Sequence, residues 1–456
     1  MSALARYLHV CGYYISGSDK EQSPLINDLQ AEGIKNIWTP HSKKSTGDSC
    51  PDLIIYSTAI EHSNEEFIWA KENKKEILHR SELLELITNP KRLISVSGTH
   101  GKTTTSGMIA EMLLNNGFDP SVILGGILES KNTNSIVGNG DYFVTEADES
   151  DKSFLRGNPE IAIITNIESD HLENFPGGLE EIKALFLEFA KKAILKKGLI
   201  VCMQDKNTNE LIRKNFDLNN PKLISYGTNT NSTEVTIKAN FNNKTNSWDV
   251  LLKEESLFSL KLKNPGEHNI LNALAAICVG HLIGINPEKI KIALENYRGI
   301  KRRFQILTKT NEITIVDDYA HHPTEITATI KATKELRPKR LIIIFQPHQP
   351  RRLQDLWNDF IGAFKGENNP VFITDLYIAR GKQIKDISSQ KLVQDINKPN
   401  VNYLPGNIEE IAKYLLAFIK EGDFILIMGA GNITNLGPRL INLMADNKMR
   451  FREQLI

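Results

Sequence analysis

The sequence predicts an α/β protein of about three domains, built on parallel sheets that carry helices on both faces. Its 456 residues correspond to roughly three domains at about 150 residues each. Short β-branched runs alternate with helix-length segments almost throughout the chain, which is typical of parallel sheets. One glycine-rich turn joins an apolar run to a helix-like run, as in α/β folds that bind phosphates.

The predicted strands follow one another with a helix-length segment between them. In chain order they are PDLIIYS, RLISVSG, DYFVTEAD, EIAIITN, GLIVCM, RLIIIF, PVFITD and FILIMG. One stretch, 233–263, departs from this rhythm, because TEVTIKANF, SWDVLLK and LFSLKLK follow each other without a helix. We expect these three runs to form a small antiparallel sheet, with NNKTN as one of its turns.

Two polar or glycine-containing segments separate successive α/β series. They are TNPK at 88–91 and YRGIKRRF at 297–304. The predicted domains are therefore residues 1–90, 91–299 and 300–456.

The composition points to local binding pockets and not to a charged surface. Lys+Arg and Asp+Glu are both 55, so nothing favours a nucleic-acid or membrane-surface partner. The longest apolar runs are far shorter than the roughly 20 residues that span a bilayer, and no signal peptide is evident. The cysteines show no C-x-x-C spacing, so we expect no zinc site or disulfide framework and a reducing cytoplasm; they are Cys11, Cys50, Cys202 and Cys278.

The start of the chain reads as the second half of a βαβ nucleotide-binding unit. A helix is expected from Met1 to about Val10, followed by a strand that ends at Ser18 and Asp19. We expect the first strand and its glycine loop to be encoded upstream of Met1. The alternative is a simple N-terminal surface helix.

SVSGTHGKTTTSGM has the residues of a phosphate-binding loop. The amides around Gly98 and Gly101 can wrap phosphates, Lys102 supplies a positive charge, and Thr103 can offer a hydroxyl to Mg²⁺. The loop is shorter than G-x-x-x-x-G-K-[ST], because Val96 stands where that pattern has glycine. The alternative is a glycine-rich turn with an incidental lysine.

A phosphate site also needs a metal ligand, and DYFVTEADESD places carboxylates at the end of a strand. Glu146 is the predicted ligand. Asp148, Glu149 and Asp151 could instead form a solvated acidic turn.

The next strand leads into NIESDHLENF, which should bring Asn166 and His171 to the same sheet edge. A lone histidine is usually structural. As a metal ligand, His171 would suit Mn²⁺ or another transition ion better than Mg²⁺, which prefers oxygen.

NPGEHNILNALAA begins with a turn and continues as an alanine-rich helix. His268, Asn269 and Asn272 lie near its start, where they could cap the helix or contact a base.

Three later turns follow predicted strands. VDDYAHHPTEI, 316–326, gathers two aspartates, a tyrosine and two histidines before a proline-opened helix. FQPHQPRRL offers His348 and Arg352 as anion contacts, although Arg351 and Arg352 could equally form a solvated basic face. IMGAGNI is a glycine-containing strand-to-helix turn.

Taken in order, GTHGKTTT, EADESDKSF, TNIESDH, GEHNILNALAA, KRRF, DDYAHHPTE, FQPH and MGAGNI resemble the Mur ligases of peptidoglycan synthesis. The resemblance covers essentially the whole chain. It implies a Rossmann-like N-terminal domain for UDP, a central P-loop ATPase domain, and a Rossmann-like C-terminal domain that closes over the amino acid. The implied reaction is ATP-dependent joining of L-alanine to the lactyl carboxylate of UDP-N-acetylmuramate through an acyl phosphate.

The resemblance also implies roles for individual residues. The ATP contacts would be Gly98, Thr99, His100, Gly101, Lys102, Thr103, Thr104, Asn269, Asn272 and Asp317. The ligands of Mg²⁺, or of Mn²⁺, would be Thr103, Glu146 and His171. The catalytic residues would be Lys102, Arg303 and His348. The substrate contacts would be Ser18, Asp19, Ser57, His348 and Arg352.

The sequence departs from the family pattern at two places. The G-x-G-G-x-G turn of the family would lie before Met1, and Gln349 and Pro350 follow FQPH where many relatives have R-Y-x-R.

Two alternative functions stay open. One is ligation of a recycled tripeptide to the same nucleotide sugar. The motif EADESDKSF, in which Ser150 precedes Asp151, argues against this alternative because it resembles the alanine-adding members of the family. The other is a non-catalytic nucleotide-binding protein.

Overall fold

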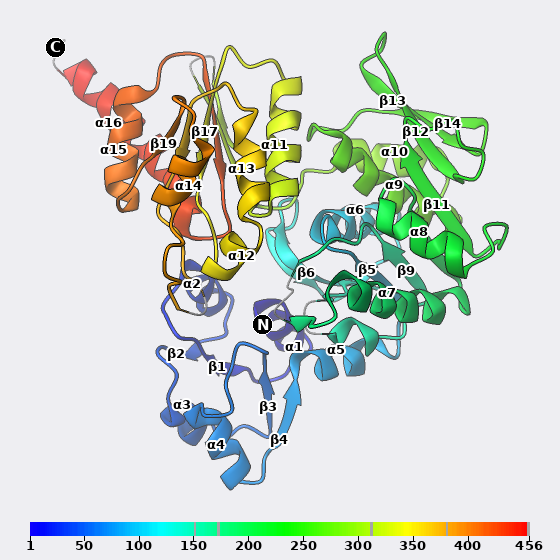
Figure 1. Ribbon diagram of the computed structural model, residues 1–456. Helices are drawn as coiled ribbons and strands as arrows, with labels where there is room; N and C mark the ends of the chain where they lie inside the picture. Colours follow the sequence, from blue (N-terminus) through cyan, green and yellow to red (C-terminus); the bar gives the residue numbers. More distant parts are fainter. Residues whose placement is uncertain (150–151, 171–173, 311–312, 380–381, 454–456) are drawn as a thin grey trace. The chain divides into compact units, whose positions relative to one another are not determined.

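Figure 1 presents the computed structural model of the chain. The structure describes residues 1–149, 152–170, 174–310, 313–379 and 382–453. The chain divides into two compact units. The first consists of Met1–Lys263 and Ile270–Arg298, and the second of Asn264–Asn269 and Gly299–Ile456.

The first 90 residues form short helices and strands. These are α1 (Ser2–Val10), β1 (Ser16–Ser18), α2 (Pro24–Ala31), β2 (Asn36–Trp38), α3 (Lys43–Ser49), β3 (Leu53–Tyr56), α4 (Glu65–Glu72), β4 (Glu76–His79) and α5 (Arg80–Thr88). Within the described residues, β1 pairs with β2 and β3 with β4, both in parallel, as separate two-stranded sheets. The predicted helix and strand at the start of the chain are confirmed by α1 and β1.

The rest of the first unit is organised around one large sheet. Its elements are β5 (Arg92–Ser97), α6 (Lys102–Asn115), β6 (Ser121–Leu128), β7 (Thr133–Ile136), β8 (Tyr142–Glu146), η1 (Ser153–Leu155), β9 (Ile161–Ile164), α7 (Gly178–Ile194), β10 (Gly198–Cys202), α8 (Lys206–Asn215), β11 (Leu223–Thr228), β12 (Ile237–Asn242), β13 (Ser247–Leu252), β14 (Glu255–Leu260), α9 (Glu267–Leu282) and α10 (Pro287–Asn296). Among the described residues, the strand order is β14-β13-β12-β11-β10-β9-β5-β8-β6-β7.

Strand β5 lies inside this sheet, between two parallel neighbours. It pairs with β8 on one side and with β9 on the other. Ile94 and Val96 are fully buried, as expected for a parallel strand that is covered on both faces. Since parallel strands end at the same edge, the residues that follow β5, β8 and β9 come together there.

The antiparallel meander predicted for 233–263 is present as β12, β13 and β14. The prediction is confirmed, and the structure adds that the meander is part of the large sheet. Strand β12 pairs in parallel with β11, with Tyr226 opposite Ile237, and so extends the large sheet. The alternation of apolar residues predicts the strands, but not which strand outside the meander they pair with.

The second unit is a doubly wound α/β domain. Its elements are β15 (Gln305–Lys309), β16 (Ile313–Asp318), α11 (Pro323–Glu335), β17 (Arg340–Phe345), α12 (Pro350–Asp355), α13 (Trp357–Lys365), β18 (Val371–Ile373), α14 (Ser389–Ile396), β19 (Val401–Tyr403), α15 (Ile408–Phe418), β20 (Asp423–Met428), η3 (Asn432–Asn435) and α16 (Leu436–Glu453). The strand order in the described chain is β15-β16-β20-β17-β18-β19, with antiparallel β15 at the edge.

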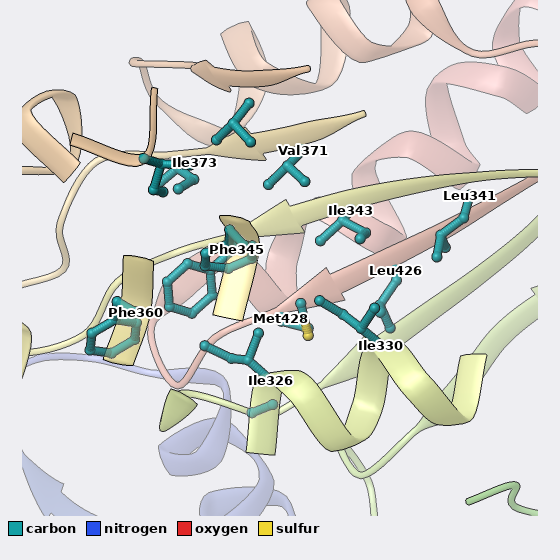
Figure 2. Close-up of a cluster of buried hydrophobic side chains, with 14 of the residues drawn as sticks. Ile326, Ile330, Leu341, Ile343, Phe345, Phe360, Val371, Ile373, Leu426 and Met428 are labelled. Carbon is teal, nitrogen blue, oxygen red and sulfur yellow. The ribbon is translucent and has the colours of Figure 1, made fainter. Parts of the chain in front are cut away.

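Two apolar cores cover the faces of this second sheet. One face packs against α11, α13 and α14, where Phe345 on β17 stacks on Phe360 at a ring-centroid distance of 5.8 Å. Figure 2 shows this core, with Ile326 and Ile330 of α11 beside Met428 and Leu426 of β20. The other face packs against α15 and α16. Among the described residues, no helix is long and apolar enough to cross a membrane.

Candidate active site

The predicted phosphate loop connects β5 to α6 and needs glycine at two positions. Gly98 has φ +132° and Gly101 has φ +82°, a region that favours glycine. A Cβ at Gly98 would lie 2.1 Å from Thr165 Oγ1, and one at Gly101 would lie 2.5 Å from Asn272 Oδ1. The loop therefore passes too close to its neighbours to carry side chains at these two positions.

The residues that follow β9 hold the loop in place. His100 N donates to Asn166 Oδ1 at 2.8 Å, and Asn166 Nδ2 donates to His100 O at 3.1 Å. Thr99 N donates to Asn166 O at 3.1 Å, and Glu168 N donates to Thr99 Oγ1 at 2.8 Å. Asn166 thus lies at the expected sheet edge, where it fixes the loop backbone.

Helix α6 begins directly after the loop with Lys102, Thr103 and Thr104. Its N-cap is Gly101, which has no side chain to accept hydrogen bonds from the first turn. The amides of that turn and the positive end of the helix dipole are the usual donors to a bound phosphate.

Thr103 and Glu146 form a pair of oxygen ligands beside the loop. Thr103 Oγ1 donates to Glu146 Oε2 at 2.8 Å, and Gly125 N donates to Glu146 Oε1 at 2.5 Å. A hydroxyl next to a carboxylate fits a hard cation such as Mg²⁺. The third predicted ligand, His171, lies outside the described residues.

Lys102 and Glu149 form a buried ion pair at the loop. Lys102 Nζ lies 3.0 Å from both carboxylate oxygens of Glu149. It also donates to Gly98 O at 2.6 Å and to Thr99 O at 3.3 Å. Burial lowers the pKa of Lys102, but the carboxylates of Glu149 and Asp148 outweigh this effect and raise its pKa.

The solvated acidic turn that the sequence left open is wrong for Glu149, which is only 6% exposed. The physical reason is the buried ammonium of Lys102, which a buried carboxylate can compensate. Asp148 lies 3.6 Å from Arg80 Nη2 in a partly exposed ion pair. Ser150 and Asp151 lie outside the described residues.

The two asparagines of α9 have different surroundings. Asn272 Oδ1 accepts from Thr105 Oγ1 of α6 at 3.1 Å and lies beside Gly101 of the predicted phosphate loop. Asn269 Nδ2 donates to Pro265 O at 2.7 Å, within the segment Asn264–Asn269. Nearby, burial lowers the pKa of His268 to about 4.

In the second unit, two aspartates lie at the end of β16. Asp317 Oδ2 accepts from Thr434 Oγ1 at 2.6 Å, while Asp317 Oδ1 is buried with no hydrogen-bond partner in the described residues. Burial raises the pKa of Asp317 to about 6. Asp318 has a structural role, since it accepts from Phe304 N at 2.6 Å and from Ala320 N at 2.8 Å.

The arginines of KRRF converge on the same strand end. The guanidinium groups of Arg302 and Arg303 lie 4.8 Å and 5.0 Å from the ring centroid of Tyr319. Arg302 Nε lies 3.7 Å from Asp317 Oδ2, and Arg303 Nη1 lies 3.7 Å from Glu325 Oε1. Arg303, predicted to be catalytic, and Asp317, predicted to contact ATP, thus belong to one local cluster of charged groups.

His348 and Arg352 also lie together in the second unit. Arg352 Nη1 is 3.5 Å from His348 Nδ1, and the His348 ring stacks on Tyr377 at 5.8 Å. Arg352 is buried, whereas the side chain of Arg351 is 64% exposed and pairs with Asp355. The alternative prediction of a solvated basic face is therefore confirmed for Arg351 and wrong for Arg352.

Comparison with known proteins identifies the family to which this chain belongs. The Mur ligase middle domain matches residues 96–280, the Mur ligase glutamate ligase domain matches 302–431, and the Mur ligase family catalytic domain matches 1–92. The UDP-N-acetylmuramate–L-alanine ligase of Clostridium tetani is 40% identical over 441 residues, which are 96% of this chain and 94% of that protein. The chain belongs to the Mur ligase family.

Other relatives agree with this assignment. The UDP-N-acetylmuramate–L-alanine ligase of Dictyoglomus turgidum is 39% identical over 97% of this chain and 94% of its own length. The crystal structure of the UDP-N-acetylmuramate-alanine ligase from Thermotoga maritima has a TM-score of 0.82 and 28% identity, covering 98% of this chain and 97% of that one. A murein peptide ligase from Psychrobacter arcticus, at 22% identity and a TM-score of 0.70, shares the fold. The chain therefore has the three-domain Mur ligase fold.

The Mur ligase substrate contacts predicted in the N-terminal part lie at the ends of two strands. Ser18, the last residue of β1, shares a hydrogen bond of 2.7 Å with His41 Nδ1. The next residue, Asp19, accepts from Lys20 N at 2.7 Å. Ser57 follows β3, and its carbonyl accepts from Ile60 N at 3.0 Å. Their role in binding stays a prediction.

Sequence reasoning missed several residues that shape the Mur ligase C-terminal turns. Arg302 Nη2 donates to Gly429 O at 2.7 Å, and so ties KRRF to IMGAGNI. Gln346 accepts from Ile433 N at 3.2 Å and donates to Asn432 Oδ1 at 2.8 Å. Glycine at the MGAGNI turn was the available signal, because a Cβ at Gly431 would lie 2.3 Å from Gln346 Oε1.

Proposed function

We propose that this Mur ligase joins L-alanine to the lactyl carboxylate of UDP-N-acetylmuramate at the expense of ATP. One observation carries the proposal: a glycine loop, Lys102, and the adjacent Thr103–Glu146 pair are assembled at the end of β5. The naming of relatives at 35–40% identity as UDP-N-acetylmuramate–L-alanine ligases supports the choice of substrates. We place the reaction in the cytoplasm, where peptidoglycan precursors would be made.

The chemistry requires an activated acid. A carboxylate is a poor electrophile, because attack by an amine would have to expel an oxide or hydroxide. In the proposed reaction the carboxylate oxygen attacks the γ-phosphorus of ATP, ADP leaves, and an acyl phosphate forms. The alanine nitrogen then attacks the acyl carbon, inorganic phosphate leaves, and the nitrogen loses its proton to give the amide.

In this reaction the chain contributes positioning and positive charge. The first-turn amides of α6 and the ammonium of Lys102 would hold the phosphates and stabilise the transferring phosphoryl group. Magnesium, or manganese, held by Thr103 and Glu146 with His171 as the predicted third ligand, would neutralise the phosphate oxygens.

The remaining contacts stay predictions. Arg303 and Asp317 stay predicted for the nucleotide, and Arg352 for the substrates. His348, predicted to be catalytic, is one candidate for the base that deprotonates the alanine ammonium. Asn269 and Asn272 stay predicted for the adenine. The division into domains at 1–90, 91–299 and 300–456 also remains part of this proposal.

Phosphate release tests the proposed function directly. Purified protein is incubated with ATP, Mg²⁺, UDP-N-acetylmuramate and one amino acid at a time. We expect release that depends on both UDP-N-acetylmuramate and L-alanine. Lys102→Ala should reduce that release by at least about 100-fold, since it removes the charge that would stabilise the transferring phosphoryl group.

The matched control is Lys238→Ala. Lys238, on β12, is another buried lysine of the first unit, and its Nζ lies 2.9 Å from Glu254 Oε1. Its variant should keep the activity if it is folded. Turnover with the tripeptide and none with L-alanine would replace our assignment by tripeptide ligation. ATP binding without any turnover would favour a non-catalytic protein, and near-normal release by Lys102→Ala would refute the role of that lysine.

A further inference from the structure

All three hydrogen-bond donors of the Lys102 ammonium are used by protein groups, so none is free to bind a phosphate. Its contacts are both oxygens of Glu149 at 3.0 Å, Gly98 O at 2.6 Å and Thr99 O at 3.3 Å. An ammonium has three donors, so these contacts use all of them. The pair is well shielded, because the side chains of Lys102 and Glu149 are 16% and 7% exposed.

One of these partners must leave if a phosphate oxygen is to reach Lys102. The carbonyls of Gly98 and Thr99 belong to the loop backbone, which Asn166 holds through hydrogen bonds to Thr99 and His100. Glu149 is a side chain on the irregular segment after β8, and rotation about its χ angles moves its carboxylate without disturbing the loop. Glu149 is therefore the partner that can be exchanged.

Charge leads to the same conclusion. A carboxylate and a triphosphate are both anions, and like charges at contact distance in a poorly hydrated site repel strongly. A buried ammonium, however, needs an anion beside it whether or not a nucleotide is present, since an uncompensated buried charge is strongly destabilising. Either the carboxylate of Glu149 or a bound phosphate can therefore neutralise the charge of Lys102, but not both at once.

We propose that Glu149 is an exchangeable counter-ion, which occupies the phosphate position at Lys102 in the empty protein and is displaced when ATP binds. The inference rests on the proposed function, because it takes ATP as the ligand of the loop. Glu149 is then a positioning residue. It keeps the loop assembled without nucleotide, and it weakens ATP binding by the free energy needed to break its pair with Lys102.

Glu149→Gln tests the exchange, because it keeps the size of the side chain and removes its charge. We expect this variant to bind the β,γ-imido analogue of ATP, with Mg²⁺, about tenfold more tightly than the wild type. Adenosine, which brings no phosphate to Lys102, should bind to both proteins equally. Without nucleotide the variant should unfold at a lower temperature than the wild type.

Glu254→Gln is the matched control. It removes the partner of buried Lys238 on β12, which three strands separate from β5 in the sheet order. It should leave the affinity for the ATP analogue unchanged. A general loosening of the first unit would change both variants, whereas displacement of Glu149 changes only one.

Three outcomes would overturn the inference. The first is an unchanged or weaker affinity of Glu149→Gln for the ATP analogue beside normal binding by the wild type. The second, which needs no variant, is a crystal structure of the wild type with the analogue bound and Glu149 still in hydrogen-bond contact with Lys102. The third is a wild type that binds no ATP analogue at all, which would overturn the proposed function together with this inference.

Discussion

Gly101 shows how one residue in the phosphate loop combines two requirements. Its φ is +82°, and a Cβ would lie 2.5 Å from the amide oxygen of Asn272. Gly284 has nearly the same backbone, with φ +80°, but has open space around the position of its Cβ. The two glycines therefore separate the effect of backbone strain from the effect of crowding.

We expect Gly101→Ala to lower the affinity for the ATP analogue at least about tenfold and to cost about 2–3 kcal/mol of stability, because both strain and overpacking act there. Gly284→Ala should cost only about 1 kcal/mol and leave the affinity unchanged. Calorimetric titration and urea unfolding of both variants measure these effects. Equal losses of affinity in both would show that crowding against Asn272 is unimportant.

At the residue scale, the sequence predicted which residue types form the site better than it predicted their contacts. GTHGKTTT is sufficient to predict that Lys102 and Thr103 follow a glycine-containing turn between a strand and a helix. EADESD cannot tell which of its carboxylates is buried, because that depends on how the chain turns after β8. The pairing of Glu149 with Lys102 is a tertiary contact between residues 47 positions apart, and neither motif encodes it alone.

At the scale of elements, the decisive arrangement is that β8 and β9 flank β5. The sequence predicted three parallel strands whose carboxyl ends carry the loop, Glu146 and Asn166. It could not give the strand order, which depends on packing between distant segments. For the same reason it predicted the meander but not the parallel pairing of β12 with β11.

The carboxyl of Asp317, at the end of β16, should make the stability of the second unit depend on pH. The pKa of this carboxyl is raised from 3.8 to about 6 by burial, so the folded state holds the proton more tightly than the unfolded state. The free energy of unfolding should therefore fall as pH rises from about 4 to 6 and level off above, by about 3 kcal/mol at most.

Asp317→Asn removes this titration and tests it. The stability of the variant relative to wild type should improve by up to about 3 kcal/mol between pH 4 and pH 7, measured by urea unfolding at each pH. The exposed Asp359→Asn, on α13, serves as the control for the loss of a carboxylate from the second unit. A difference between Asp317→Asn and wild type that does not change with pH would contradict the buried, proton-holding carboxyl.

At the scale of the whole molecule, the boundary between the units does not follow the order of the sequence. Asn264–Asn269 belongs to the second unit, although the chain before and after it belongs to the first. Gly266 shows the reason, since a Cβ there would lie 2.8 Å from the Cβ of Ala332 on α11. The predicted boundary near 297–304 could not include this short segment, because no change in composition marks it.

Gly266→Ala should therefore disturb the second unit. Its φ of +98° and the contact with Ala332 together should cost about 2–3 kcal/mol. We expect faster amide hydrogen exchange in α11 and unchanged exchange in α7 of the first unit. Faster exchange in α7 alone would assign the segment to the first unit instead.

This interleaving limits how members of the family can be recombined. The chain passes from one unit to the other after Lys263, after Asn269 and after Arg298. A chimera with a single junction at 299 would build its second unit from two parents, with residues 264–269 supplied by the wrong one. A swap of the second unit between relatives must therefore include residues 264–269 as well.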